Sequence, residues 1–121
     1  MRVRAARGAI RVAEDRSDVV LTATERLLGA LLSRNAIERG DLVSVLFTVT
    51  EDIRSAFPAE AARRMGLGIV PLMCAQEIPV EGSMPSVVRI LAHFHSDRTL
   101  DDVVHVYLDG AESLRDDVER S

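Results

Sequence analysis

The chain has 121 residues, of which 47% are hydrophobic and 28% charged, and its formal net charge is -4. This length and balance indicate one globular domain and exclude a disordered or collagen-like chain. No run of about 18 apolar residues is present, and no apolar segment follows the charged N-terminus. The sequence therefore predicts neither a transmembrane helix nor a signal peptide, and we expect a cytoplasmic protein that does not bind membranes.

The charged and sulfur-containing residues narrow the function further. All 15 cationic residues are arginine, so a Schiff-base lysine and a P-loop are excluded. An acidic total without a basic stripe or aromatic platforms argues against nucleic-acid binding. The single cysteine, Cys74, excludes an intrachain disulfide and a multi-cysteine zinc site. Any fixed cation in a functional site must be a guanidinium.

The first half of the chain predicts a strand, a helix and a second strand. Alternating side chains over residues 1–12 predict the first strand. Asp15 or Ser17 is expected to cap a helix that runs to about Arg34, with apolar residues at helical spacing. Residues 42–50 are β-branched and apolar on both faces, which predicts a central, buried strand.

The second half predicts a short helix and three more strands. Pro58 is expected to begin a helix that continues to about Arg64. Residues 69–78 predict a strand or an irregular extended segment, because Pro71 favours an edge or a bulge. The remaining segments are a loop at 79–85, a strong strand at 87–95, a turn with one helical turn at 96–102 and a last strand at 103–108.

This order predicts an α+β fold, a five-stranded mixed sheet with one long helix and short helical turns, in a single domain spanning residues 1–121. One long helix cannot cover both faces of such a sheet. We therefore expect the uncovered face to pack against another subunit in an oligomer.

Charged residues inside apolar strands are the candidates for function. Arg89 lies within an apolar strand, where an unpaired arginine would cost several kcal/mol, so it must meet an acid or an anionic ligand. Glu77 is a candidate partner for Arg89, although it could also be a solvated strand end. Arg7, beside Gly8, is either a ligand-binding group or an exposed arginine on an edge strand.

No sequence motif indicates a metal or a cofactor. His93, His95 and His105 could bind zinc, but no carboxylate or second cysteine lies at a supporting spacing. We therefore expect no metal and no cofactor. Arginines in apolar surroundings with one carboxylate suit a small organic anion, and chemistry that depends on positioning and charge stabilisation.

Six segments in order resemble one family, the monofunctional chorismate mutases of the trimeric mixed α/β type. They are residues 4–9, 47–50 with Asp52, 56–59 with Ala62 and Arg63, 70–72 with Cys74, Gln76 and Glu77, 88–90, and 105–108 with Leu114 and Arg115. The resemblance implies a homotrimeric pseudo α/β barrel with active sites between adjacent subunits. It also implies the [3,3] rearrangement of chorismate to prephenate, without a covalent intermediate or a cofactor.

The resemblance also assigns roles to residues. Arg89 would donate to the breaking ether oxygen, and Arg7 would bind a substrate carboxylate that Tyr107 helps to place. Glu77 would accept from the ring hydroxyl, with Cys74 close to it. The other substrate-binding residues would be Phe57, Leu114, Leu72 and Met73 as walls, and Arg63 and Arg115 as cations at the mouth, which a flexible C-terminal tail from about residue 115 helps to close.

Two departures and two alternatives accompany this resemblance. Glu60 stands where some members carry lysine, and Met73 replaces a small polar residue seen in some members. The first alternative is a trimeric reactive-imine deaminase or small-anion binding protein of similar architecture. The second is a non-catalytic interaction protein in which Arg89 and Glu77 form a structural pair.

Overall fold

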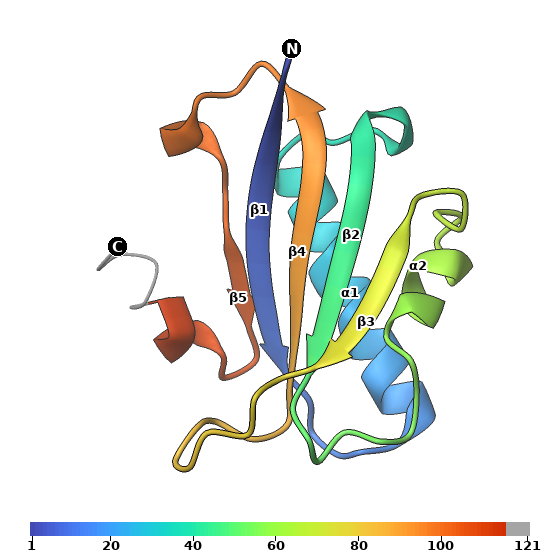
Figure 1. The fold of residues 1–121 in the computed structure, drawn as a ribbon, viewed down its shortest axis with the longest axis vertical. Helices are drawn as coiled ribbons and strands as arrows, with labels where there is room; N and C mark the ends of the chain where they lie inside the picture. Colours follow the sequence, from blue (N-terminus) through green and yellow to red (C-terminus); the bar gives the residue numbers. More distant parts are fainter. Residues whose placement is uncertain (116–121) are drawn as a thin grey trace.

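The structure, a computed structural model, describes residues 1–115, except for the side chain of Arg115. Its centre is a five-stranded mixed sheet with strand order β3-β2-β4-β1-β5 and one long helix behind it (Figure 1). The elements are β1 (Arg2–Arg11), α1 (Ser17–Arg34), β2 (Leu42–Val49), α2 (Ala59–Arg64), β3 (Leu72–Gln76), β4 (Val87–Ser96) and β5 (Val106–Leu108), with short 3-10 turns at Arg39–Asp41, Leu100–Asp102 and Glu112–Arg115. The predicted fold class is confirmed.

Strand β4 lies at the middle of the sheet and runs antiparallel to both of its neighbours, β1 and β2. The edge strands are parallel to the strands that they pair with, β3 to β2 and β5 to β1. Side chains on β4 therefore stand at the centre of each sheet face, and Arg89 is one of them.

Helix α1 covers one face of the sheet and forms the main core with it. Leu27, Leu28 and Leu31 are fully buried, as are Phe47 of β2 and Phe94 of β4. Burial of each such side chain stabilises the fold by about 1.5–3 kcal/mol. The helical spacing in the sequence thus identified the face of α1 that packs on the sheet.

Over the other face of the sheet, residues 1–115 place no α-helix. On β2, Val45 and Phe47 point into the core, whereas Ser44, Leu46 and Thr48 lie on this open face and are partly exposed. The prediction that β2 is apolar on both faces is wrong, because two of these three side chains are polar. The open face is therefore mixed, and it can carry charged groups.

Two strands are shorter than predicted, for reasons of backbone hydrogen bonding. Strand β3 begins after Pro71, which has no N–H to give to a ladder, although its carbonyl accepts from Val45 N at 3.0 Å. Strand β5 begins at Val106, because the side chain of Asn35 takes up the backbone groups of Val104.

The predicted cap of α1 is also wrong. Arg16 is the N-cap and makes no side-chain capping bond, and Ser17 is the first helical residue. Asp15 instead accepts from the backbone N–H groups of Arg54 and Ser55, each at 3.0 Å. Within the described part of the chain, no helix combines the length and hydropathy that a membrane span requires.

Asn35 generates a stability prediction. Its buried side chain donates to the carbonyls of Leu31 (2.9 Å) and Val104 (2.8 Å), and accepts from Val104 N (2.7 Å). Asn35→Ala would leave the partly buried backbone of Val104 without these partners, and we expect a loss of about 2–4 kcal/mol in the free energy of unfolding. Urea unfolding at a fixed protein concentration measures it.

The matched control for Asn35 is Ser33→Ala, near the same helix end. The Ser33 side chain is exposed and makes one long hydrogen bond of 3.4 Å to Ala30 O, so a change below about 0.5 kcal/mol is expected. Equal changes in the two variants would contradict the role given to Asn35.

Candidate active site

A cluster of three side chains lies at the centre of the open face. Thr48 of β2 is directly opposite Arg89 of β4 in the antiparallel register, and Glu77 follows the end of β3. Arg89 Nε donates to both carboxylate oxygens of Glu77 at 3.1 Å, and Thr48 Oγ1 donates to Glu77 Oε2 at 2.9 Å. The expected pairing of Arg89 with Glu77 is confirmed.

The backbone holds this cluster in place. Glu77 N donates to Val49 O at 2.9 Å, which continues the line of β3 beyond its last ladder residue. Glu77 thereby reaches the open face although the edge strand has ended. A carboxylate that accepts from a guanidinium and a hydroxyl is oriented by both donors.

The pair is accessible to a ligand. The side chain of Arg89 is 41% exposed and that of Glu77 is 20% exposed. Among the described residues, Arg89 uses only Nε in hydrogen bonds, so its two terminal NH2 groups remain available as donors. A guanidinium fixed at Nε with free terminal groups suits the recognition of an anion.

A cavity of about 260 Å³ lies beside this cluster on the open face, and Thr48 and Arg89 form part of its wall. It is lined by Arg7, Gly8, Leu46, Thr48, Arg89, Ile90, Leu91, Tyr107 and Leu114. Four of the predicted site residues therefore gather here, from β1, β4, β5 and the last 3-10 turn: Arg7, Arg89, Tyr107 and Leu114. Two cations lie beside a single carboxylate, which leaves surplus positive charge for an anionic ligand.

Sequence reasoning missed Thr48 and Leu46 as lining residues. The sequence did contain a sign of their position, because Thr48 is a polar residue inside an apolar strand. Leu46 is two residues before it and therefore lies on the same face of the strand. Its contact with Glu77 required the register of β2 against β4, which the sequence pattern does not specify.

A second cavity, of about 340 Å³, lies along the edge strand β3 and includes Phe57 and Cys74. Cys74 is paired in register with Phe47, which points into the core under α1, so Cys74 is on the helix-covered side of the sheet. Arg89 is on the opposite side. Within one chain, the structure therefore does not bring Phe57 and Cys74 together with Arg89.

The other predicted lining residues are divided in the same way. Leu72 is half-buried and packs on the main core, whereas Met73 points to the opposite side of β3 and is largely exposed. Arg63 of α2 forms an ion pair with Glu60 at 3.0 Å. Glu60, which stands where some members of the resembled family carry lysine, therefore neutralises part of the charge of Arg63. The side chain of Arg115 lies outside the described residues.

The histidines have separate surroundings. His105 Nδ1 accepts from the backbone N–H of Arg7 at 3.0 Å, and His93 Nδ1 lies 3.2 Å from Ser44 Oγ. Over residues 1–115, no three histidine, cysteine or carboxylate side chains are grouped as metal ligands.

Two carboxylates brace the loops that lead into the site. Asp52 accepts from Ser86 N (3.2 Å) and Ser86 Oγ (2.9 Å), just before Arg89 on β4. Partial burial alone would raise the pKa of Asp52, but hydrogen bonds from Thr50 and Ser86 outweigh it and lower the pKa below 3.8. The pKa of Asp15 is lowered in the same direction, chiefly by its hydrogen bond with Ser55.

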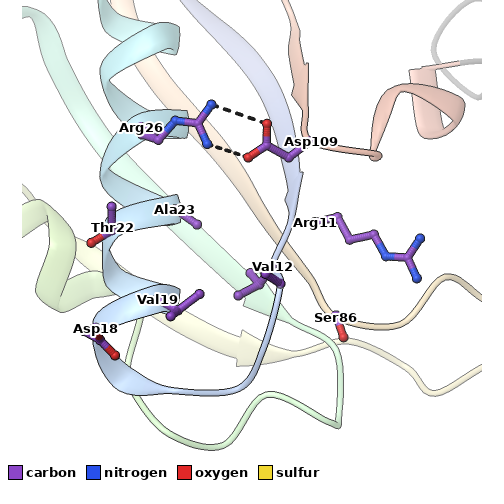
Figure 2. A pocket seen from close by; sticks show the side chains of 10 residues that line it. Arg11, Val12, Asp18, Val19, Thr22, Ala23, Arg26, Ser86 and Asp109 are labelled. Atoms are coloured by element: carbon purple, nitrogen blue, oxygen red, sulfur yellow. Dashed lines mark hydrogen bonds and ion pairs between the residues drawn. The ribbon is translucent and has the colours of Figure 1, made fainter.

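A larger groove, of about 590 Å³, lies between α1 and the ends of β1 and β5 (Figure 2). Arg11 and Asp18 line it, and Arg26 forms a two-pronged ion pair with Asp109 across it. Of the predicted site residues whose side chains the structure describes, none lines this groove. We take the smaller cavity as the candidate active site, because Arg7 and Arg89 line it and Arg89 is held by its ion pair with Glu77.

Comparisons with known proteins identify the family to which the chain is similar. The profile of the family described as chorismate mutase type I matches residues 3–118. The chain is 51% identical over 118 residues to chorismate mutase AroH of Thermus thermophilus, covering 97% of each chain. It is 34% identical over 119 residues to chorismate mutase AroH of Bacillus subtilis, covering 98% of this chain and 94% of that one. A solved chorismate mutase from Clostridium thermocellum superposes with a TM-score of 0.90 at 41% identity, over 91% of this chain and 98% of that one.

The brace at Asp52 generates a pH prediction. Because the pKa of Asp52 is lowered in the folded protein, its contribution to stability is complete above the ordinary value of 3.8. The contribution is lost as the pH falls through the lowered value. Asp52→Asn should therefore cost about 1 kcal/mol at pH 7, a figure discounted for solvent exposure, and the gap should close towards pH 3.

Thermal unfolding of the Asp52→Asn variant and of the parent protein between pH 7 and pH 3 measures this gap. Asp97→Asn is the matched control, since that side chain is 84% exposed and should change little at any pH. A gap for Asp52→Asn that stays constant or widens on acidification would contradict the assignment.

Proposed function

This chain belongs to the type I chorismate mutase family, and we propose that its activity, the isomerisation of chorismate to prephenate, takes place at the open-face cavity around Arg89. The reaction lies on the route to phenylalanine and tyrosine. We assign it to the cytoplasm, as expected from the sequence. The observation that carries the site assignment is the guanidinium of Arg89, held at Nε by Glu77 with its terminal NH2 groups available.

The chemistry explains why such a group would be useful. In this intramolecular [3,3] rearrangement, the ether C–O bond breaks as a new C–C bond forms, and negative charge develops on the ether oxygen. A fixed donor at that oxygen is worth about 3–4 kcal/mol in the transition state. Arginine keeps its charge at any working pH, so no proton transfer is needed.

One donor does not account for the whole rate. An acceleration on the order of a millionfold requires about 8 kcal/mol. The remainder comes from holding chorismate in the compact, chair-like conformer in which the two ends meet. Arg7 and Tyr107, which share the cavity with Arg89, would place a substrate carboxylate, and Leu114 would supply an apolar wall.

Glu77 would accept a hydrogen bond from the ring hydroxyl of the substrate. Its carboxylate already receives Arg89 Nε and Thr48 Oγ1, but two carboxylate oxygens offer about four acceptor positions. Thr48 fixes the orientation of this carboxylate. Glu77 therefore serves as the partner of Arg89 and as a substrate acceptor at once.

We propose that a homotrimer completes the site. The helices of residues 1–115 leave the open face uncovered in one chain, and Phe57 stands 76% exposed beside Cys74, on the other side of the edge strand. If a neighbouring subunit presents its Phe57, Cys74 and Arg63 to this cavity, the two groups of predicted residues become one site. Leu72, Met73 and Arg115 would then line or close the same cleft.

The alternatives from the sequence are not favoured. A reactive-imine deaminase or a small-anion binding protein of similar architecture gives no reason for Arg7, Cys74, Glu77, Arg89 and Tyr107 to occur together. A purely structural Arg89–Glu77 pair would not need accessible NH2 groups. The family match also spans nearly the whole chain.

Arg89→Lys is the test of this function. Purified protein is incubated with chorismate, and the loss of its ultraviolet absorbance and the formation of prephenate are followed. A lysine keeps the charge but cannot both pair with Glu77 through Nε and donate from two terminal groups, so kcat should fall by about a hundredfold or more. The variant should keep the molecular mass of the parent in solution, which we expect to be that of three chains.

The matched control is Arg34→Lys, an exposed arginine in the last turn of α1, which should leave the rate within about twofold. No turnover of chorismate by the parent protein above the spontaneous rate would overturn the proposed function. Turnover by the parent with near-normal activity in Arg89→Lys would overturn the role of Arg89 alone.

A further inference from the structure

A histidine next to the candidate active site contacts the backbone of Arg7. His105 is half-buried and lies immediately before β5, and its Nδ1 accepts from the backbone N–H of Arg7 at 3.0 Å. The parallel ladder between β1 and β5 starts one residue later, where Gly8 is paired with Val106. The ring of His105 therefore occupies the place of a backbone acceptor at the start of this ladder.

The direction of this hydrogen bond defines the state of the ring. A backbone N–H can only donate, so His105 Nδ1 must carry a lone pair and no proton. An imidazolium, with protons on both nitrogens, could not make the contact. The ring that holds Arg7 is therefore the neutral form.

The backbone at Arg7 is also confined from the other side. A Cβ on Gly8 would lie 3.0 Å from Leu27 Cδ1 and 3.0 Å from Val106 O, closer than side chains normally pack. Only glycine lets β1 approach α1 and β5 this closely. With His105 on the neighbouring amide, the backbone of Arg7 has little freedom to move, and the starting point of its side chain is fixed.

We propose that His105 is a positioning residue for Arg7: by accepting the Arg7 N–H at Nδ1, it fixes the base from which the Arg7 guanidinium reaches the substrate. This inference rests on the proposed function, in which Arg7 binds a carboxylate of chorismate. A guanidinium on a long side chain loses binding when its base shifts, because the fork no longer meets both carboxylate oxygens. The effect should therefore fall on substrate binding more than on the chemical step.

Three variants separate the acceptor from the ring. In His105→Asn, Oδ1 is the same number of bonds from the backbone as Nδ1 of histidine, so the acceptor is kept. His105→Leu keeps the bulk and removes the acceptor, and His105→Gln moves its oxygen one bond further out. We expect KM for chorismate to rise about tenfold in His105→Leu with kcat changed less than threefold, and to stay within about twofold of the parent in His105→Asn.

A double-mutant cycle with Arg7→Ala shows whether the effect passes through Arg7. If it does, His105→Leu should add nothing further to the KM of Arg7→Ala. His95→Leu, the same change at an exposed histidine on β4, should leave KM unchanged. Should His105→Leu fail to fold, His105→Gln replaces it in both measurements with the same expected rise.

Amide hydrogen exchange at Arg7 provides a readout that does not depend on activity. The Arg7 amide should be protected in the parent and in His105→Asn, and should exchange at least tenfold faster in His105→Leu. Equal losses in the Asn and Leu variants, a further rise of KM in the Arg7→Ala background, or unchanged exchange would each overturn the proposal. A parent protein that protects this amide but does not turn over chorismate would overturn the proposed function instead.

Discussion

The ion pair between Arg89 and Glu77 is the interaction on which the site depends. The central strand of the sheet carries a guanidinium on a face that no helix of the described part of the chain covers, and burial there without a partner would be costly. The carboxylate of Glu77 accepts a hydrogen bond from Nε of Arg89, and the hydroxyl of Thr48 orients the same carboxylate. One arrangement thus meets the structural requirement to pair a charge and the requirement, in the proposed mechanism, to fix a donor.

The sheet itself explains why the predicted site residues fall into two groups within one chain. Side chains alternate between its faces, so Cys74 and Glu77, three residues apart along β3 and its extension, face opposite sides. Phe57 and Cys74 flank the helix-covered side at an edge, whereas Arg7 and Arg89 stand on the open face. The proposed trimer resolves this division, because an edge of one subunit can be laid against the open face of the next.

The sequence predicted the elements well and their contacts only in part. Helical spacing located α1, strand alternation located β1, and largely apolar runs located β2 and β4. The charge of Arg89 inside an apolar strand led to Glu77 as its candidate partner. Other features depend on tertiary partners that local patterns do not contain. Asp15 bonds to a distant loop instead of capping α1, Asn35 displaces the start of β5, and Thr48 reaches Glu77 only because of the strand register.

Subunit mixing tests most directly whether each site combines two subunits. One variant, Arg89→Ala, loses the open-face half, and another, Phe57→Asp, places a carboxylate in the other half, against an anionic substrate. Each alone should be nearly inactive. When the two are unfolded and refolded together in equal amounts, random assembly should restore about a quarter of the parent activity, since that share of interfaces joins two intact halves. Activity no higher than that of the separate variants would contradict the account.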